Sequence, residues 1–300
     1  MIDLVNITIV VLLSGVVIAA ALAYLRRVRM DRPPVGVFNT SDLVFLAGVV
    51  IVMPVVYQWL PAWVVGALFV VFGTGLMWMT LSPWLGAAGR WTSLAVAATD
   101  VGLVVSGHAP SVAFNVVNGI AIGLMVVGAS NTWVQGGIRA RAVAAMAAFI
   151  AVYDLCATWL SPVTYEFFLR VKDLPFAPIL TWGVGDGLAG AGLGDMLVAA
   201  LWVAVVDKAY GRRHAHVAFG LTWALVPLVY DPLLLLGLVP RSAAIMVMLG
   251  PIIVAHYLYL RRRHPRERTF AEYAGLRSHR LGLIGQQPLA PAGPGVRTPG

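Results

Sequence analysis

Apolar stretches of about twenty residues, separated by short polar segments, make up most of the chain. A helix of about twenty apolar residues crosses the ~30 Å hydrocarbon core of a bilayer. The pattern therefore predicts an all-α, polytopic membrane protein with about nine transmembrane helices in residues 1–262. The predicted spans are 5–25, 42–60, 62–81, 92–106, 112–134, 140–160, 177–206, 216–236 and 242–260.

The composition agrees with this class and narrows the chemistry. Of the 300 residues, 60% are hydrophobic and only 11% are charged. Cys156 is the single cysteine, which excludes an internal disulfide and a cysteine-based zinc site, and the six histidines show no metal-ligand spacing. The composition therefore predicts no metal site. The net charge of +8 is better explained by arginines on the cytoplasmic side of a membrane than by nucleic-acid binding.

Positive charges gather in alternate loops, and these loops predict the orientation. Cytoplasmic loops carry an excess of lysine and arginine. The groups follow the first, third, fifth, seventh and ninth predicted spans, so the N-terminus is predicted outside and the C-terminus in the cytoplasm, in a plasma membrane of prokaryotic type. The charged residues on this side are Arg26, Arg27, Arg29, Arg32, Arg90, Arg139, Arg141, Lys208, Arg212, Arg213, Arg261, Arg262, Arg263, Arg266 and Arg268.

Two segments outside the predicted spans have distinct compositions. Residues 263–300 form a cytoplasmic tail that begins with a basic run, expected to touch anionic headgroups, and ends in a segment rich in proline and glycine. Residues 286–300 are expected to be disordered, because they cannot bury enough apolar surface to offset the entropy of ordering. The outer loop 161–176 mixes β-branched, aromatic and charged residues and is expected to form a strand or hairpin.

Three acidic residues, Asp100, Asp154 and Asp195, lie well inside apolar runs. A charge inside the membrane is costly and marks a functional site by default. Asp154 and Asp195 belong to consecutive antiparallel spans, at about 140–160 and 187–206, and both lie about twelve residues or ~18 Å from the predicted cytoplasmic end. They are therefore expected to face each other.

Two neighbouring carboxylates at low dielectric share a proton, which is the arrangement of aspartic proteases. The ionised acid takes a proton from the attacking water, and the protonated acid bonds to the peptide carbonyl oxygen. Gly192 and Gly194 are expected to allow close helix packing beside Asp195. From the acids alone, structural hydrogen bonds to neighbouring helices or an ion path remain open.

The residues around both acids resemble a known family. Tyr153-Asp154 and Gly192-Leu193-Gly194-Asp195 are similar to the Tyr-Asp and Gly-x-Gly-Asp signatures of presenilins and signal peptide peptidases, the intramembrane aspartyl proteases. The resemblance covers residues 142–208 well and implies nine spans, Asp154 and Asp195 as the catalytic pair, and a role for Tyr153 in orienting it. It also implies transmembrane-helix or signal-peptide substrates and no cofactor.

The third family signature, Pro-Ala-Leu, is altered here. Its best match is Pro232-Leu233-Leu234, expected to bind substrate backbone, with a rival placement at residues 237–240. An ordinary proline at the boundary of a span is the alternative.

Two other functions remain open at this stage. A proton- or cation-coupled transporter would use the same buried acids, and a prepilin-peptidase-like protease also carries a Gly-x-Gly-Asp motif. Asp100, with Asn115 and Asn118, is interpreted as a polar seam between the fourth and fifth spans. Roles for Asp186 and Asp231, the substrate and the oligomeric state do not follow from the sequence.

Overall fold

The computed structural model describes residues 4–30, 40–159, 163–183, 188–224, 228–229, 232–233, 236 and 245–280. The chain is mostly helical, and four helices are long and apolar enough to cross a membrane. These four are α1 (Leu4–Arg27), α3 (Ala62–Leu85), α5 (Val112–Gln135) and most of α6 (Ala140–Trp159). They match the predicted spans closely, because long apolar runs fix both the position and the length of such helices.

The remaining predicted spans correspond to helices of more varied length. The predicted spans 42–60, 92–106 and 242–260 overlap α2 (Thr40–Trp59), α4 (Ala87–Val105) and α11 (Met246–Arg263). The span predicted at 216–236 begins within α9 (Arg212–Phe219) and the π-helical turn η2 (Gly220–Ala224), and most of its remainder lies outside the described residues. The structure therefore supports a helical membrane protein without showing nine spans.

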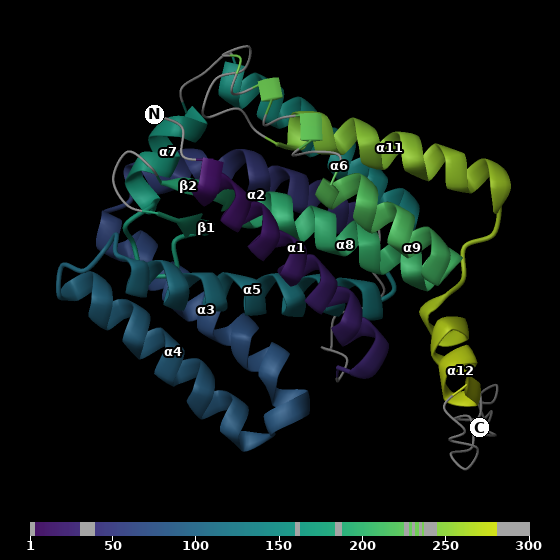
Figure 1. The fold of residues 1–300 in the computed structure, drawn as a ribbon, viewed down its shortest axis with the longest axis horizontal. Helices are drawn as coiled ribbons and strands as arrows, with labels where there is room; N and C mark the ends of the chain where they lie inside the picture. Colours follow the sequence, from purple (N-terminus) through teal and green to yellow (C-terminus); the bar gives the residue numbers. More distant parts are fainter. Residues whose placement is uncertain are drawn as a thin grey trace, which may run out of the picture.

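The helix α8 (Leu193–Tyr210) lies at the centre of the bundle, where it packs against α1, α5, α6 and α9 (Figure 1). Residues Leu201 to Val206 are completely buried. A helix that is apolar on all sides is expected in such a position, because every face has a protein neighbour.

A β-hairpin precedes α8 and corrects two predictions. β1 (Ile179–Trp182) and β2 (Ala189–Gly192) pair antiparallel, with Ile179 opposite Gly192 and Trp182 opposite Ala189. The predicted continuous span 177–206 is therefore wrong in its first half, and the fold is not all-α. The reason is the glycine content: six of the twelve residues in 183–194 are glycine, which strongly disfavours a helix.

The outer loop 161–176 also differs from its prediction, since it contains the helix α7 (Val163–Val171) rather than a strand. Glu166 in its first turn and Arg170 in its last turn complement the helix dipole. Phe167, Phe168 and Val171 contact a small apolar cluster that includes Val65. An amphipathic segment with this spacing buries one face as a helix.

The chain beyond α11 returns to the bundle. After Arg263 a short segment leads into α12 (Phe270–Arg280), which contacts the end of α8 through Tyr273 and Asp207. The first part of the predicted tail is therefore a folded element, and its arginines Arg266 and Arg268 bond to protein groups. Residues 286–300, predicted to be disordered, lie outside the described residues.

Candidate functional site

Asp154 lies in the second half of α6, on a helix held closely by α11. An added Cβ at Gly250 of α11 would lie 2.5 Å from the Ala151 Cβ and 2.7 Å from the Ala147 carbonyl oxygen. Only glycine fits this contact, which lies one turn before Asp154. The two helices therefore pack at backbone distance beside the acid.

Asp195 occupies the N-terminus of α8, at a position fixed by the hairpin. Gly192 ends β2 and is the N-cap of α8, so Asp195 is the third helical residue. Its carboxylate accepts a hydrogen bond from the Gly192 N–H, which is the acid half of a capping box. An added Cβ at Gly192 would lie 3.0 Å from Asp195 Oδ2. The first glycine of the motif therefore leaves room for the carboxylate to turn back on its own N-cap.

The structure brings the two acids together. α6 packs against α8, and the charge of Asp154 acts directly on Asp195. Both side chains are partly buried. Two like charges so placed at low dielectric disfavour ionisation of both carboxylates at once.

The other motif residues have different environments. Tyr153 precedes Asp154, and the two side chains are close enough to interact electrostatically. In the described part of the chain, no hydrogen bond joins the Tyr153 hydroxyl to either aspartate. The Leu193 N–H donates to the Pro178 carbonyl oxygen at 2.9 Å, which fastens the start of α8 to the start of β1. Gly194 is exposed, and an added Cβ there would meet nothing within 4 Å. Gly194 therefore takes no part in helix packing, but it leaves the backbone beside Asp195 accessible.

The altered third motif is only partly described. Pro232 is exposed, Leu233 is half-buried, and Leu234 lies outside the described residues. The Pro232 carbonyl accepts a bond from the Leu236 N–H at 3.0 Å. A different proline, Pro251, lies on α11, the helix that packs along α6. Sequence reasoning did not single out Pro251, because it lies inside a helical run rather than at its start.

The sequence predicted that Asp100 joins the fourth and fifth spans, but in the structure it binds elsewhere. It is fully buried, and its Oδ2 accepts a bond from the Phe176 N–H at 2.7 Å. Phe176 has a φ of 55° and packs against Gly73, where an added Cβ would lie 2.4 Å from its ring. The carboxylate therefore anchors an unusual backbone turn just before β1.

Asn115 and Asn118 of α5 also bind this segment rather than α4. Asn118 Nδ2 donates to the carbonyl oxygens of Ala177, at 3.1 Å, and Ile179, at 2.9 Å. Asn115 Nδ2 donates to the Gly183 carbonyl oxygen at 2.8 Å, and its Oδ1 accepts from the Thr181 hydroxyl at 2.9 Å. The polar seam expected between two spans is thus a set of anchors for β1.

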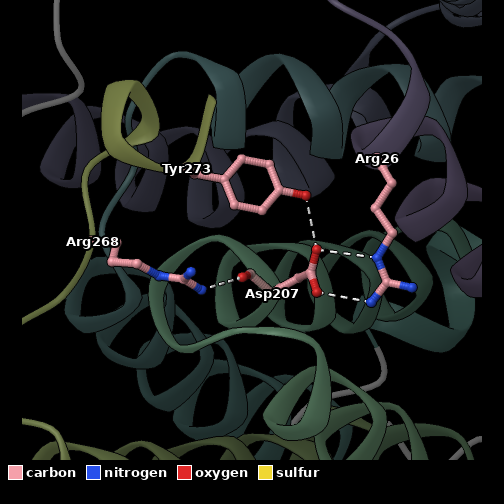
Figure 2. Close-up of polar contacts among 4 residues, drawn as sticks. All are labelled: Arg26, Asp207, Arg268 and Tyr273. Atoms are coloured by element: carbon pink, nitrogen blue, oxygen red, sulfur yellow. Dashed lines mark hydrogen bonds and ion pairs between the residues drawn. The ribbon is translucent and has the colours of Figure 1, made fainter. Parts of the chain in front are cut away.

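A second carboxylate site lies at the other end of α8, centred on Asp207. This side chain is 1% exposed and accepts two bonds from the Arg26 guanidinium, Nη2 to Oδ1 at 2.8 Å and Nε to Oδ2 at 3.2 Å. The Tyr273 hydroxyl donates to Oδ2 at 2.9 Å (Figure 2). A bidentate pair with a further donor is among the stronger arrangements available to a buried carboxylate.

Contacts from Arg268 and Glu267 to backbone groups complete the Asp207 site. Arg268 Nη2 donates to the Asp207 carbonyl oxygen at 3.0 Å (Figure 2). Arg268 Nε donates to the Ala209 carbonyl oxygen at 3.2 Å. These carbonyls belong to the last turn of α8, where the Asp207 carbonyl also accepts from the Gly211 N–H at 3.1 Å and the Ala209 carbonyl from the Arg268 N–H at 3.3 Å. Glu267 meanwhile accepts a bond from the Ala140 N–H, at the start of α6, at 3.0 Å.

Sequence reasoning missed the Asp207 site, although one signal was present. Arg26 and Asp207 both end apolar runs on the same predicted side of the membrane. Opposite charges at the same depth are candidates for pairing, but nothing in the pattern identifies which of many arginines is the partner.

Within the described residues, no group of three or more His, Cys, Asp or Glu side chains is arranged to hold a metal ion. No protein-family model and no curated protein matches the chain.

Proposed function

We propose that the protein is an intramembrane aspartyl endopeptidase that hydrolyses peptide bonds of transmembrane or signal-peptide helices. The observation that carries the proposal is the meeting of Asp154 and Asp195, from two packed helices, at a distance where their charges interact. A second support is the resemblance of the Tyr-Asp and Gly-x-Gly-Asp motifs around the two acids to those of presenilins and signal peptide peptidases.

The mechanism follows from the sharing of one proton between two acids. The ionised carboxylate takes a proton from a water molecule, whose oxygen then attacks the peptide carbonyl. The protonated carboxyl donates a hydrogen bond to the carbonyl oxygen as negative charge develops there, and a proton then passes to the leaving amine. The Gly192 N–H bond holds the Asp195 carboxylate in place without another charged residue.

The hairpin suggests where the substrate lies. A helix must unwind locally before water reaches its carbonyls, and the extended segment then needs backbone partners inside the membrane. β1 is buried; the Asn118 side chain occupies its Ile179 carbonyl, and the Asn115 side chain occupies the Gly183 carbonyl just beyond it. β2 is more exposed and, in the described structure, bonds only to β1 and, through Gly192, to Asp195. Its outer edge is therefore suited to adding a substrate strand.

The proposed topology has nine spans in a plasma membrane of prokaryotic type. The N-terminus lies outside and the C-terminus in the cytoplasm. The arginines at the ends of α1, α9 and α11 support this orientation, since they gather on one side. This orientation favours substrate helices that have a cytoplasmic N-terminus.

The proposal is tested with purified protein in liposomes and a single-span reporter peptide. Asp154→Asn and Asp195→Asn, made singly, should each lower the cleavage rate at least about a hundredfold, the lower range for loss of general acid–base catalysis. Asp173→Asn is the matched control, because Asp173 follows α7, outside the two helices that carry the catalytic pair, and its carboxylate pairs with the adjacent Lys172. It should cleave at the parental rate.

The same preparations separate a protease from a transporter. Cleavage near the parental rate in either active-site variant would remove that aspartate from the chemistry. A proton or cation flux that disappears in both variants, without reporter cleavage by the parent, would favour the transporter instead. An aspartyl-protease transition-state inhibitor should stop cleavage by the parent.

A further inference from the structure

A cavity of about 610 Å³ lies away from the aspartates, between α11 on one side and α9 with η2 on the other. It is open to the surroundings, since Val217 and Tyr259 on its two walls are 53% and 50% exposed. Its position at the arginine-rich end of both helices places it at the level of one membrane surface. This volume falls in the range of small-molecule and cofactor sites.

The wall of the cavity changes from apolar to polar along its length. Val217, Leu221, Ile252 and Ala255 line the part that extends toward the middle of the helices. This part of the lining carries neither a charge nor a side-chain hydrogen-bonding group. It is suited to a hydrocarbon chain rather than to a polar solute.

The opposite end of the cavity is cationic. Arg213 lines it, and the Arg263 guanidinium lies 5.2 Å from the centre of the Tyr259 ring that forms its rim. His214 also lines this end, with its ring 4.9 Å from that of His264. No acidic residue is among the residues that line the cavity. Since arginine stays charged, this end favours an anion.

A buried polar group on the wall has an unused hydrogen-bonding position. His256 is 6% exposed, and its Nδ1 lies 3.3 Å from Nε1 of Trp202. An indole N–H can only donate, so Nδ1 accepts and a neutral His256 carries its proton on Nε2. That nitrogen has no partner among the described residues. Buried donors are seldom left unpaired, which points to an acceptor that a ligand would bring.

We propose that this cavity binds one anionic phospholipid from the leaflet at the arginine-rich side of the membrane. Its phosphate lies by Arg213 and Arg263, and one acyl chain lies along Val217, Leu221 and Ile252. The phosphate or ester oxygens accept from His256 after a small side-chain rotation. The occupant is a lipid because an anionic end and an apolar wall of this length are joined in one cavity.

The test uses the full chain purified in a neutral detergent and native mass spectrometry. The probes are dioleoyl phosphatidylglycerol, dioleoyl phosphatidylcholine with the same acyl chains, and glycerol phosphate as the headgroup alone. One phosphatidylglycerol should remain bound, at least about fivefold more tightly than phosphatidylcholine, since one surface arginine contributes about this much to the binding of an anionic lipid.

Two variants address the two ends of the cavity separately. Arg213→Gln should weaken phosphatidylglycerol about fivefold and leave phosphatidylcholine unchanged. Ala255→Phe places an aromatic ring in the apolar part and should weaken both lipids. Arg262→Gln and Leu258→Phe are the controls, because both residues are exposed on α11 and neither lines the cavity.

Equal retention of the two lipids by the parent would overturn the proposal, as would parental binding in both Arg213→Gln and Ala255→Phe. Binding of glycerol phosphate as tight as that of the whole lipid would also overturn it, because the apolar wall would then contribute nothing. If Ala255→Phe lost binding while Arg213→Gln still preferred phosphatidylglycerol to phosphatidylcholine, the preference for an anion would not come from Arg213. The assignment of the phosphate to the Arg213 end of the cavity would then be wrong.

Discussion

The two ends of α8 each carry a buried or partly buried aspartate, and the two acids have opposite surroundings. Asp207 is bound by Arg26, Tyr273 and the backbone contacts of Arg268 (Figure 2). Asp195 has one backbone donor, from Gly192, and another acid as its neighbour. The same side chain on the same helix is thus neutralised at one end and left beside a like charge at the other.

This difference separates stability from reactivity. A carboxylate whose oxygens are bonded to fixed cations and hydroxyls contributes to folding but is a poor proton acceptor for water. A carboxylate beside another acid contributes little to folding, but its proton can move. Variants at the two ends should therefore have opposite effects on unfolding and on catalysis.

The largest expected effect on stability comes from Asp207→Asn. The change leaves the Arg26 charge partly buried and uncompensated, which costs about 3–5 kcal/mol when a buried pair loses one partner. Unfolding monitored in mixed detergent micelles measures it. Asp173→Asn breaks the more exposed pair with Lys172 and should cost less than about 1 kcal/mol. Equal losses in the two variants would mean that burial of Asp207 has no energetic consequence.

Tyr273→Phe removes a single donor from the same carboxylate. Because the hydrogen bond has a charged acceptor, the variant should lose about 1.5–2 kcal/mol in the same unfolding measurement. Asp207→Asn combined with Tyr273→Phe should cost less than the sum of the two, because both act on one network. Additive losses would indicate that the hydroxyl acts independently of Asp207.

Gly192→Ala tests the packing at the other end of α8. Its new Cβ would lie 3.0 Å from Asp195 Oδ2, so the carboxylate must shift by a few tenths of an ångström. Cleavage of the reporter should fall about tenfold, since misplacement of reacting groups by ~1 Å costs up to a hundredfold. Gly194→Ala is the matched control: its Cβ meets nothing within 4 Å, and its rate should stay within about twofold of the parent.

Asp195→Asn should have almost no effect on stability. The amide oxygen of asparagine still accepts from the Gly192 N–H, and the repulsion from Asp154 disappears. We expect a change within about 0.5 kcal/mol of zero in the unfolding measurement. If Asp195→Asn lowered the free energy of unfolding as much as Asp207→Asn, the proposed difference between the two sites would be wrong.

The smallest effect concerns α12, whose docking supports the Asp207 site. The Thr269 N–H bond, with Arg266 close by, lowers the pKa of Glu272 below its usual 4.5. Because the pKa of Glu272 is lower in the folded protein, its carboxylate contributes to the free energy of unfolding above about pH 4.5. This contribution disappears as the pH falls through the pKa of the folded state. The stability difference between the parent and Glu272→Gln should therefore shrink on acidification below pH 4.5. A difference that stays constant down to pH 3 would contradict this role.

Residues in the long apolar runs were the most predictable part of the fold. α1, α3, α5 and α6 begin and end within a few residues of the predicted bounds, because each apolar run is about as long as a helix needs to cross the bilayer. The 177–206 run was misread, since four apolar strand residues are indistinguishable from a helical segment by periodicity. The run of glycines at 183–194 was the signal against a helix there.

For the candidate site, the sequence identified the acids but not their supports. The depth of Asp154 and Asp195 in adjacent spans predicted that they would face each other. The polar partners of Asp100, Asn115 and Asn118 lie about 60 or more residues away in the chain and bond mostly to backbone, which no side-chain pattern reveals. The partner of Asp207 is equally remote in sequence.

The order of synthesis gives the contacts of Glu267 and Arg268 a further consequence. These two neighbours hold the first residue of α6 and the last turn of α8, two helices that the ribosome has completed long before. The two helices that carry the aspartates, α6 and α8, thus gain this connection only when the later stretch has emerged and docked. A nascent chain has both acids before it has the brace that aligns their helices.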